Sequence, residues 1–115
     1  MQLSKNFSSS EFECKCGCGF DGVSQELVDV LQIMRHMLDA PITINSGCRC
    51  EEYNAKVGGR AKSQHLLGTA ADIVVKGCTP AFVEEYLERR YPDSYGIGKY
   101  KSFTHIDVRP NKARW

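Results

Sequence analysis

The sequence lacks a long apolar run and has almost no net charge, and these two absences exclude several classes of protein. Lysine and arginine number 15 against 14 acidic residues, which gives a formal net charge of +1. No basic run is interleaved with aromatic residues in the way that follows a nucleic-acid backbone, so we expect no nucleic-acid partner. No stretch reads as a membrane span either. We therefore expect a globular protein.

The N-terminus also lacks the apolar region that a secretory signal peptide needs. The chain as given is therefore either made in the cytosol or already trimmed, and Met1 favours synthesis in the cytosol. The 115 residues give room for one domain, 1–115, and 42% hydrophobic with 25% charged residues is ordinary globular composition.

Histidine is scarce, with three in the chain, yet one of them begins a segment that looks like half of a metal site. His65 and Asp72 lie seven positions apart across Gly68. Residues 70–75 end in β-branched side chains and predict a strand, so Asp72 is a carboxylate on a mostly apolar strand. Burial of such a charge is costly unless it is paired or coordinates a metal ion.

A second half of the site comes late in the chain, where residues 103–108 alternate apolar and polar side chains. This alternation predicts a half-buried strand with His105 and Asp107 on the same side. Two histidines and one carboxylate leave the fourth position of a tetrahedral zinc ion open for water, as catalytic zinc requires. The pattern indicates a hydrolase. His36 is interpreted instead as an ordinary residue on a helix surface.

The motif Ser-x-His-x-x-Gly-x-Ala-x-Asp, followed by a later His-x-Asp, resembles the zinc D-alanyl-D-alanine carboxypeptidase family, peptidase family M15, whose fold is shared with the hedgehog signalling domain. The resemblance includes the Ser-Gly-x-Arg segment at 46–49 and Asn54. It implies that His65, Asp72 and His105 bind zinc. The implied fold class is α+β, with a small antiparallel sheet packed against two main helices.

Local patterns place the elements of such a fold. A helical apolar repeat over 24–38 predicts the main core helix with Ser24 as N-cap, and Thr79-Pro80 begins a second helix. We expect Phe82 among the buried residues of that second helix. The expected strands lie at 42–44, 70–75, 94–100 and 103–109.

Two residues are candidates for substrate binding. Arg49 follows a strand, and its planar guanidinium matches a terminal carboxylate with two parallel hydrogen bonds. A salt bridge to Glu51 or Glu52 is the structural alternative, and the family resemblance favours the substrate. Ser63 is predicted to hydrogen-bond the substrate backbone.

The catalytic base is the point where the sequence departs from the family pattern. Other members of the superfamily place a Glu or Asp three residues before the last histidine ligand, but here that position is Ser102. Asp107 is the best carboxylate available and is predicted to be catalytic. The alternative is that Asp107 orients a ligand histidine, a common role for carboxylates near zinc.

The six cysteines leave three interpretations open: disulfides, a second metal site, or free thiols. Alternate cysteines pair poorly with each other, but a glycine-rich Cys-x-Cys segment can wrap a metal ion or pair with a second such segment. The residues concerned are Cys14, Cys16, Cys18, Cys48, Cys50 and Cys78.

Together these features predict a monomeric, zinc-dependent metallopeptidase that hydrolyses peptidoglycan stem peptides, as a D-Ala-D-Ala carboxypeptidase or an endolysin-like endopeptidase. A compact chain without an evident signal peptide suits a phage lysis protein that acts on the cell wall after release. The alternative is a non-catalytic zinc-binding interaction module of the hedgehog-like fold, which the absence of a carboxylate at position 102 supports. The bond that is cut and a phage or bacterial origin are left open.

Overall fold

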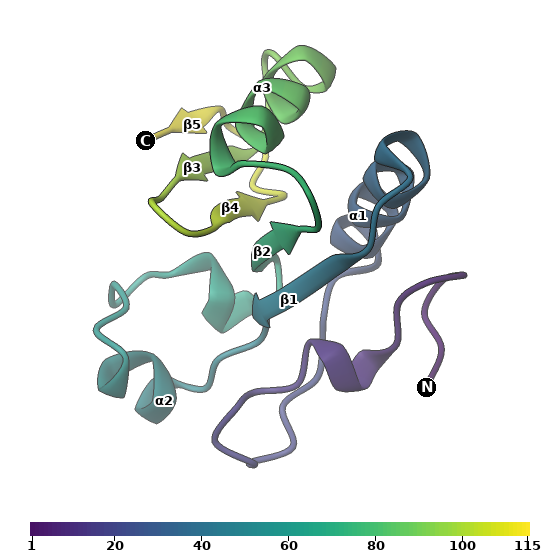
Figure 1. The fold of residues 1–115 in the computed structure, drawn as a ribbon. Helices are drawn as coiled ribbons and strands as arrows, with labels where there is room; N and C mark the ends of the chain where they lie inside the picture. Colours follow the sequence, from purple (N-terminus) through teal and green to yellow (C-terminus); the bar gives the residue numbers. More distant parts are fainter.

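The computed structural model describes residues 1–115 as three α-helices, two short 3-10 turns and one five-stranded sheet (Figure 1). The helices are α1 (Gln25–Leu38), α2 (Glu51–Lys56) and α3 (Pro80–Arg90), and the 3-10 turns are η1 (Ser9–Glu11) and η2 (Gln64–Leu67). The strands are β1 (Ile42–Ser46), β2 (Ala70–Val75), β3 (Gly96–Lys99), β4 (Thr104–Asp107) and β5 (Ala113–Arg114).

The sheet has the order β1-β2-β4-β3-β5, and all neighbours are antiparallel except the β3 and β5 pair. The predicted α+β class with a small antiparallel sheet is therefore confirmed. β2 and β4 are neighbours although a helix and a strand separate them in sequence. Their register sets Asp72 directly opposite His105, so the sheet itself brings two candidate ligands together.

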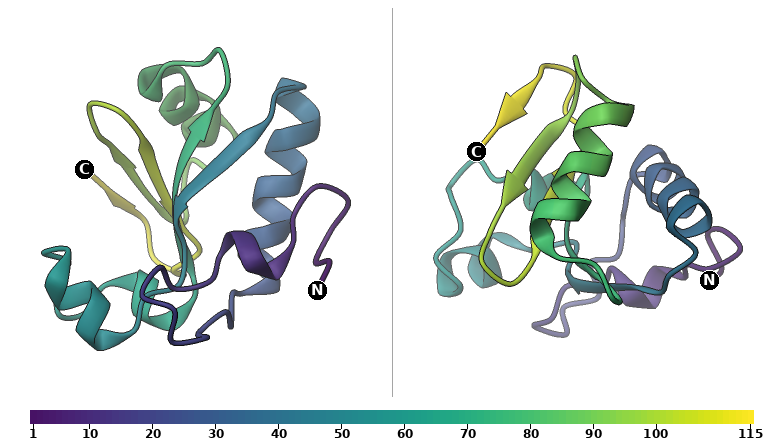
Figure 2. Two further views of the ribbon diagram at one scale, coloured as in Figure 1. Left: turned by 60° about the horizontal axis from the view of Figure 1, so that its bottom comes forward. Right: turned by 45° about the horizontal axis from the view of Figure 1, so that its top comes forward.

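The two main helices share one hydrophobic core with one face of the sheet. Figure 2 shows α1 beside β1 and α3 across β3 and β4. Ile73 and Ile106 belong to the same core cluster as Leu27 of α1 and Leu87 of α3. Because side chains alternate along a strand, Asp72 and the odd-numbered residues of β4 point to the opposite face. That second face carries the site.

Helix starts and stops follow the local chemistry of the chain. Ser24 is the N-cap of α1, and Asp39 ends it in the left-handed conformation with a φ of 47°. Thr79 caps α3 and accepts a hydrogen bond from the amide of Phe82. The expectation that Phe82 is buried was wrong, because its side chain is 49% exposed.

The segment before α1 packs against the strand end that leads toward the site. Phe7 and Phe12 are fully buried in the core. The carbonyl of Phe12 accepts a hydrogen bond of 2.8 Å from the amide of Cys48. A Cβ atom at Gly47 would lie 2.9 Å from backbone atoms of Phe12, so only glycine permits this close approach.

None of the helices combines the length and the apolar character needed to cross a lipid bilayer.

Candidate metal centre

His65 is delivered to the site by the turn η2. Ser63 is the N-cap of this turn, and its hydroxyl oxygen accepts a hydrogen bond of 3.1 Å from the amide of His65. Gly68 ends the turn with a φ of 73°, and a side chain there would collide with the carbonyl of Gly22. The glycine therefore lets the chain turn sharply from His65 into β2.

Three ligand atoms converge on the face of the sheet away from the core. Oδ1 of Asp72 lies 3.0 Å from Nδ1 of His105 and 3.3 Å from Nε2 of His65. All three residues are buried, with exposed fractions of 7% or less. The structure thus brings together the three residues predicted as metal ligands.

These atoms fit zinc in chemistry and in spacing. Two imidazole nitrogens and one carboxylate oxygen are a donor set that catalytic zinc uses. Zinc bound tetrahedrally with bonds of about 2.0 Å sets its ligand atoms about 3.3 Å apart, close to the distances found between Asp72 and the two histidines. The three donors also leave a fourth position open.

The second nitrogen of each histidine is held by another group. Nδ1 of His65 donates to the carbonyl oxygen of Gly47 at 2.7 Å, and Nε2 of His105 donates to Oδ2 of Asp107 at 2.7 Å. Such bonds fix which ring nitrogen carries the proton. In both rings the nitrogen nearest to Asp72 is the one left to bind a metal ion.

Asp107 is fully buried, and both of its oxygens are engaged. Oδ1 accepts hydrogen bonds from the amide and Nε of Arg109 at 3.1 and 2.8 Å, while Oδ2 accepts from the second terminal nitrogen of Arg109 at 2.8 Å. Burial opposes ionisation, but the bonds from Arg109 and His105 outweigh it and lower the pKa of Asp107 well below its ordinary value. Asp107 is therefore an ionised carboxylate on the far side of the His105 ring.

The pKa of Asp72 is lowered in the same way as that of Asp107. Burial opposes ionisation of Asp72 as well, but hydrogen bonds from His105 and His65 outweigh it and lower the pKa of its carboxyl. For His105, burial disfavours the charged ring, yet the bonds to Asp107 and Asp72 raise its pKa above the ordinary value. Both carboxylates therefore stabilise positive charge in the space between them.

Arg49 makes contacts that the sequence did not predict. Its Nε donates to Ser46 at 3.0 Å, one terminal nitrogen donates to Asn54 at 3.2 Å, and the other forms an ion pair with Oδ2 of Asp72 at 3.2 Å. The expected structural partners were Glu51 or Glu52, and neither pairs with it. Three of the five N–H groups of Arg49 are used, which leaves two free to donate.

A groove of about 510 Å³ borders the site along α2 and η2. Arg49 and Ser63, the two residues predicted to bind substrate, both line it. Its other lining residues are Phe20, Cys50, Glu51, Ala61, Lys62, Leu66 and Leu67. The groove thus combines an apolar wall with charged groups of both signs.

Two residues beside His105 were not identified from the sequence. The ring of Trp115 lies 5.0 Å from the ring of His105, and the guanidinium carbon of Arg109 lies 5.2 Å from the Trp115 ring. Nε1 of Trp115 donates to the hydroxyl of Tyr100 at 2.8 Å. Arg109 continues the alternation of His105 and Asp107, so the strand pattern could have revealed it. No local pattern indicates where Trp115 packs.

Comparison with known proteins agrees with this geometry. Residues 5–107 match the family model described as Peptidase M15. A stretch of 44 residues is 50% identical to the zinc D-Ala-D-Ala carboxypeptidase of Streptomyces albus G. That stretch covers 37% of this chain but only 17% of the relative, so the similarity concerns a small part of a longer protein.

Proposed function

The chain belongs to the peptidase M15 family, and we propose that it is a zinc-dependent peptidase that hydrolyses peptidoglycan stem peptides. The observation that carries the proposal is the convergence of three buried ligand atoms, from His65, Asp72 and His105, with the far nitrogen of each histidine already bonded. Hydrogen bonds from the histidines to groups that do not bind the metal orient the rings for a metal ion.

In this proposal, zinc is held by Nε2 of His65, Oδ1 of Asp72 and Nδ1 of His105. When bound there, zinc supplies Lewis acidity toward a peptide carbonyl and toward water. The protein supplies the arrangement of the donors. Gly47 and Asp107 each keep one histidine ring in the tautomer that binds metal, and Arg49 holds the second oxygen of Asp72.

Asp107 acts as a positioning residue in this account. Its carboxylate faces Nε2 of His105, whereas Nδ1 faces the metal position, so the imidazole ring stands between Asp107 and the reacting atoms. The placement supports orientation of His105 over proton removal from water. Ser102 offers no carboxylate in its place.

Arg49 and Ser63 are proposed to bind the substrate. Arg49 lines the groove and has two N–H groups left to donate to a carboxylate. The oxygen of Ser63 accepts from the amide of His65, so its O–H remains available to a substrate carbonyl. A stem peptide carries both a free carboxylate and backbone carbonyls, which is why the groove suits it.

Two modes of cleavage are compatible with the groove, that of a D-Ala-D-Ala carboxypeptidase and that of an endolysin-like endopeptidase. The zinc-loaded protein should be incubated with a soluble stem pentapeptide ending in D-Ala-D-Ala and, separately, with isolated peptidoglycan. Mass spectrometry of the products identifies the bond. Loss of one alanine from the pentapeptide indicates a carboxypeptidase, and internal cuts in peptidoglycan indicate an endopeptidase.

One observation favours the rival function of a non-catalytic zinc-binding module. Ser102 stands where other members of the superfamily place a carboxylate, and both oxygens of Asp107 are engaged by His105 and Arg109. A fully zinc-loaded protein that binds peptidoglycan and releases no product would establish the rival and refute the peptidase.

A further inference from the structure

A second cluster of metal-binding side chains lies outside the site described above. The sulfur atoms of Cys14 and Cys16 are 3.5 Å apart, those of Cys16 and Cys50 are 3.6 Å apart, and those of Cys14 and Cys50 are 3.9 Å apart. Cys18 completes the group, and its four sulfurs all lie within 4.8 Å of one another. Four thiols thus gather in one place.

These distances match a tetrathiolate metal site. A Zn–S bond of about 2.3 Å in a tetrahedron sets the sulfurs about 3.8 Å apart. All six cysteines of the chain are unpaired, and every separation is far beyond an S–S bond of about 2.05 Å. Three of the sulfurs alternate along one loop, where neighbouring cysteines pair poorly with each other.

The backbone of the loop is shaped to hold the three cysteines around one point. Gly17 and Gly19 adopt φ values of 83° and 91°, which favour glycine strongly. The amide of Gly17 donates to the carbonyl of Cys14 at 3.2 Å, and the amide of Cys14 donates to the carbonyl of Phe20 at 2.8 Å. The loop is therefore closed on itself by backbone hydrogen bonds.

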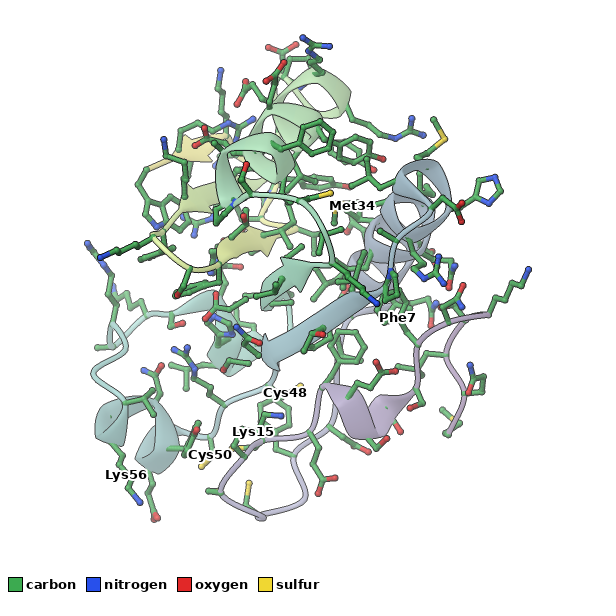
Figure 3. The ribbon with its side chains drawn as sticks, viewed as in Figure 1. Phe7, Lys15, Met34, Cys48, Cys50 and Lys56 are labelled. Atoms are coloured by element: carbon green, nitrogen blue, oxygen red, sulfur yellow. The ribbon has the colours of Figure 1, made fainter.

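The fourth cysteine comes from the N-cap of α2 and brings amide donors with it. The amide of Cys50 donates to the sulfur of Cys14, and the amide of Tyr53 donates to the sulfur of Cys50, both at 3.4 Å. Amide donors of this kind stabilise thiolates, which are the form that binds metal. Figure 3 labels Cys50 at the start of α2 and Lys15 on the N-terminal loop that carries the other three cysteines.

From this geometry we propose that Cys14, Cys16, Cys18 and Cys50 bind a second zinc ion as a structural site. Four protein ligands leave no position open for water, so the site has no hydrolytic chemistry. Its binding energy is available to folding, because the loop and α2 are brought together only in the folded chain.

The second site would support the first without touching it. Cys50 ends a short segment in which Gly47 holds His65 through its carbonyl and Arg49 holds Asp72 through its guanidinium. Anchoring Cys50 to the loop at Cys14 fixes that segment from the other side. A zinc ion bound by the four cysteines would therefore help to hold the Gly47 carbonyl and the Arg49 guanidinium against His65 and Asp72.

Metal content tests the proposal on the full-length chain, purified with a reducing agent and loaded with zinc. The wild-type protein should contain two zinc ions per chain, and the Cys16→Ser/Cys18→Ser double variant one. Cys78→Ser is the matched control and should contain two, because Cys78 lies outside the cluster. Two zinc ions in the double variant would overturn the proposal.

Cobalt substitution of the wild-type protein makes the test independent of whether the double variant folds. Cobalt in the cysteine site should show sulfur-to-cobalt charge-transfer absorption in the near ultraviolet, and His65→Ala/His105→Ala should retain that band. Absence of the band, or disulfide formation shown by the intact mass of the zinc-loaded protein, would refute the site. The band does not depend on hydrolysis at the histidine site. The cysteine site and the proposed peptidase activity can therefore be refuted independently of each other.

Discussion

His105 donates a hydrogen bond of 2.7 Å from Nε2 to Oδ2 of Asp107, on the opposite side of the ring from the nitrogen that faces Asp72. A metal ion on Nδ1 would leave the ring proton on Nε2, where Asp107 accepts it. The same hydrogen bond also removes Asp107 from direct contact with the open metal position.

Replacement of Asp107 by Asn should weaken zinc binding or activity by roughly ten- to a hundredfold, as expected for a carboxylate that orients a metal ligand. Excess zinc should restore part of the rate, because the defect lies in holding the metal. Activity measured across a zinc titration checks this. A flat rate at least about a hundredfold below wild type with zinc fully bound would identify Asp107 as the general base instead. Asp93→Asn, on an exposed turn, is the control and should match wild type.

Alanine at His65 or His105 should abolish zinc retention at the histidine site and all hydrolysis while leaving the chain folded. Neither residue belongs to the hydrophobic core cluster, which lies on the other face of the sheet. Zinc content, activity and far-ultraviolet circular dichroism should be measured together. His36→Ala, on the exposed face of α1, should change none of them. Full activity in His65→Ala or His105→Ala would show that the altered histidine is not a required metal ligand.

Arg49→Lys should keep the charge but lose the fork that spans Ser46, Asn54 and Asp72. If the main role of Arg49 is to clamp a terminal carboxylate, kcat/KM should fall only for substrates with a free carboxyl end, with zinc content unchanged. If its main role is to hold Asp72, zinc affinity and kcat/KM should fall together for all substrates. Arg60→Lys is the control, and unaltered kinetics and zinc affinity in Arg49→Lys would contradict both roles.

Gly96→Ala should reproduce the Asp107 defect without altering any polar group. A Cβ atom at Gly96 would collide with the carboxylate of Asp107 and lie 2.7 Å from Nε of Arg109. The overpacking should destabilise the fold by about 1–3 kcal/mol and displace Asp107 from His105. Urea unfolding and zinc affinity check this prediction. Gly22→Ala is the control and should be nearly neutral, because its Cβ atom would meet only the edge of the Phe20 ring, at 3.3 Å. A Gly96→Ala protein with wild-type zinc affinity would contradict the prediction.

The regular elements and the three candidate metal ligands could be predicted because each depends on local periodicity or on a motif. The apolar repeat placed α1 to within one residue, and the alternation over 103–109 located β4, which is shorter at both ends. The spacing around Gly68 and the family resemblance selected three residues. The sheet register brings Asp72 and His105 together, and the turn η2 adds His65.

What could not be predicted depends on contacts between distant segments. The bond from His65 to the carbonyl of Gly47 involves a backbone group, which has no signature in side-chain patterns. Arg49 had acidic neighbours in sequence but pairs with Asp72, 23 positions away. The gathering of Cys50 with the loop at Cys14 likewise depends on how α2 is placed, so the sequence left the state of the cysteines open.

The measurement that tests the central claim most directly is the rate of stem-peptide hydrolysis as zinc is returned to the chelator-treated protein. The account predicts no product without zinc and a rate that rises until the site of His65, Asp72 and His105 is filled. The His105→Ala protein should remain inactive at every zinc concentration. A rate that is unaffected by chelation, or the absence of product from a fully zinc-loaded wild-type protein, would contradict it.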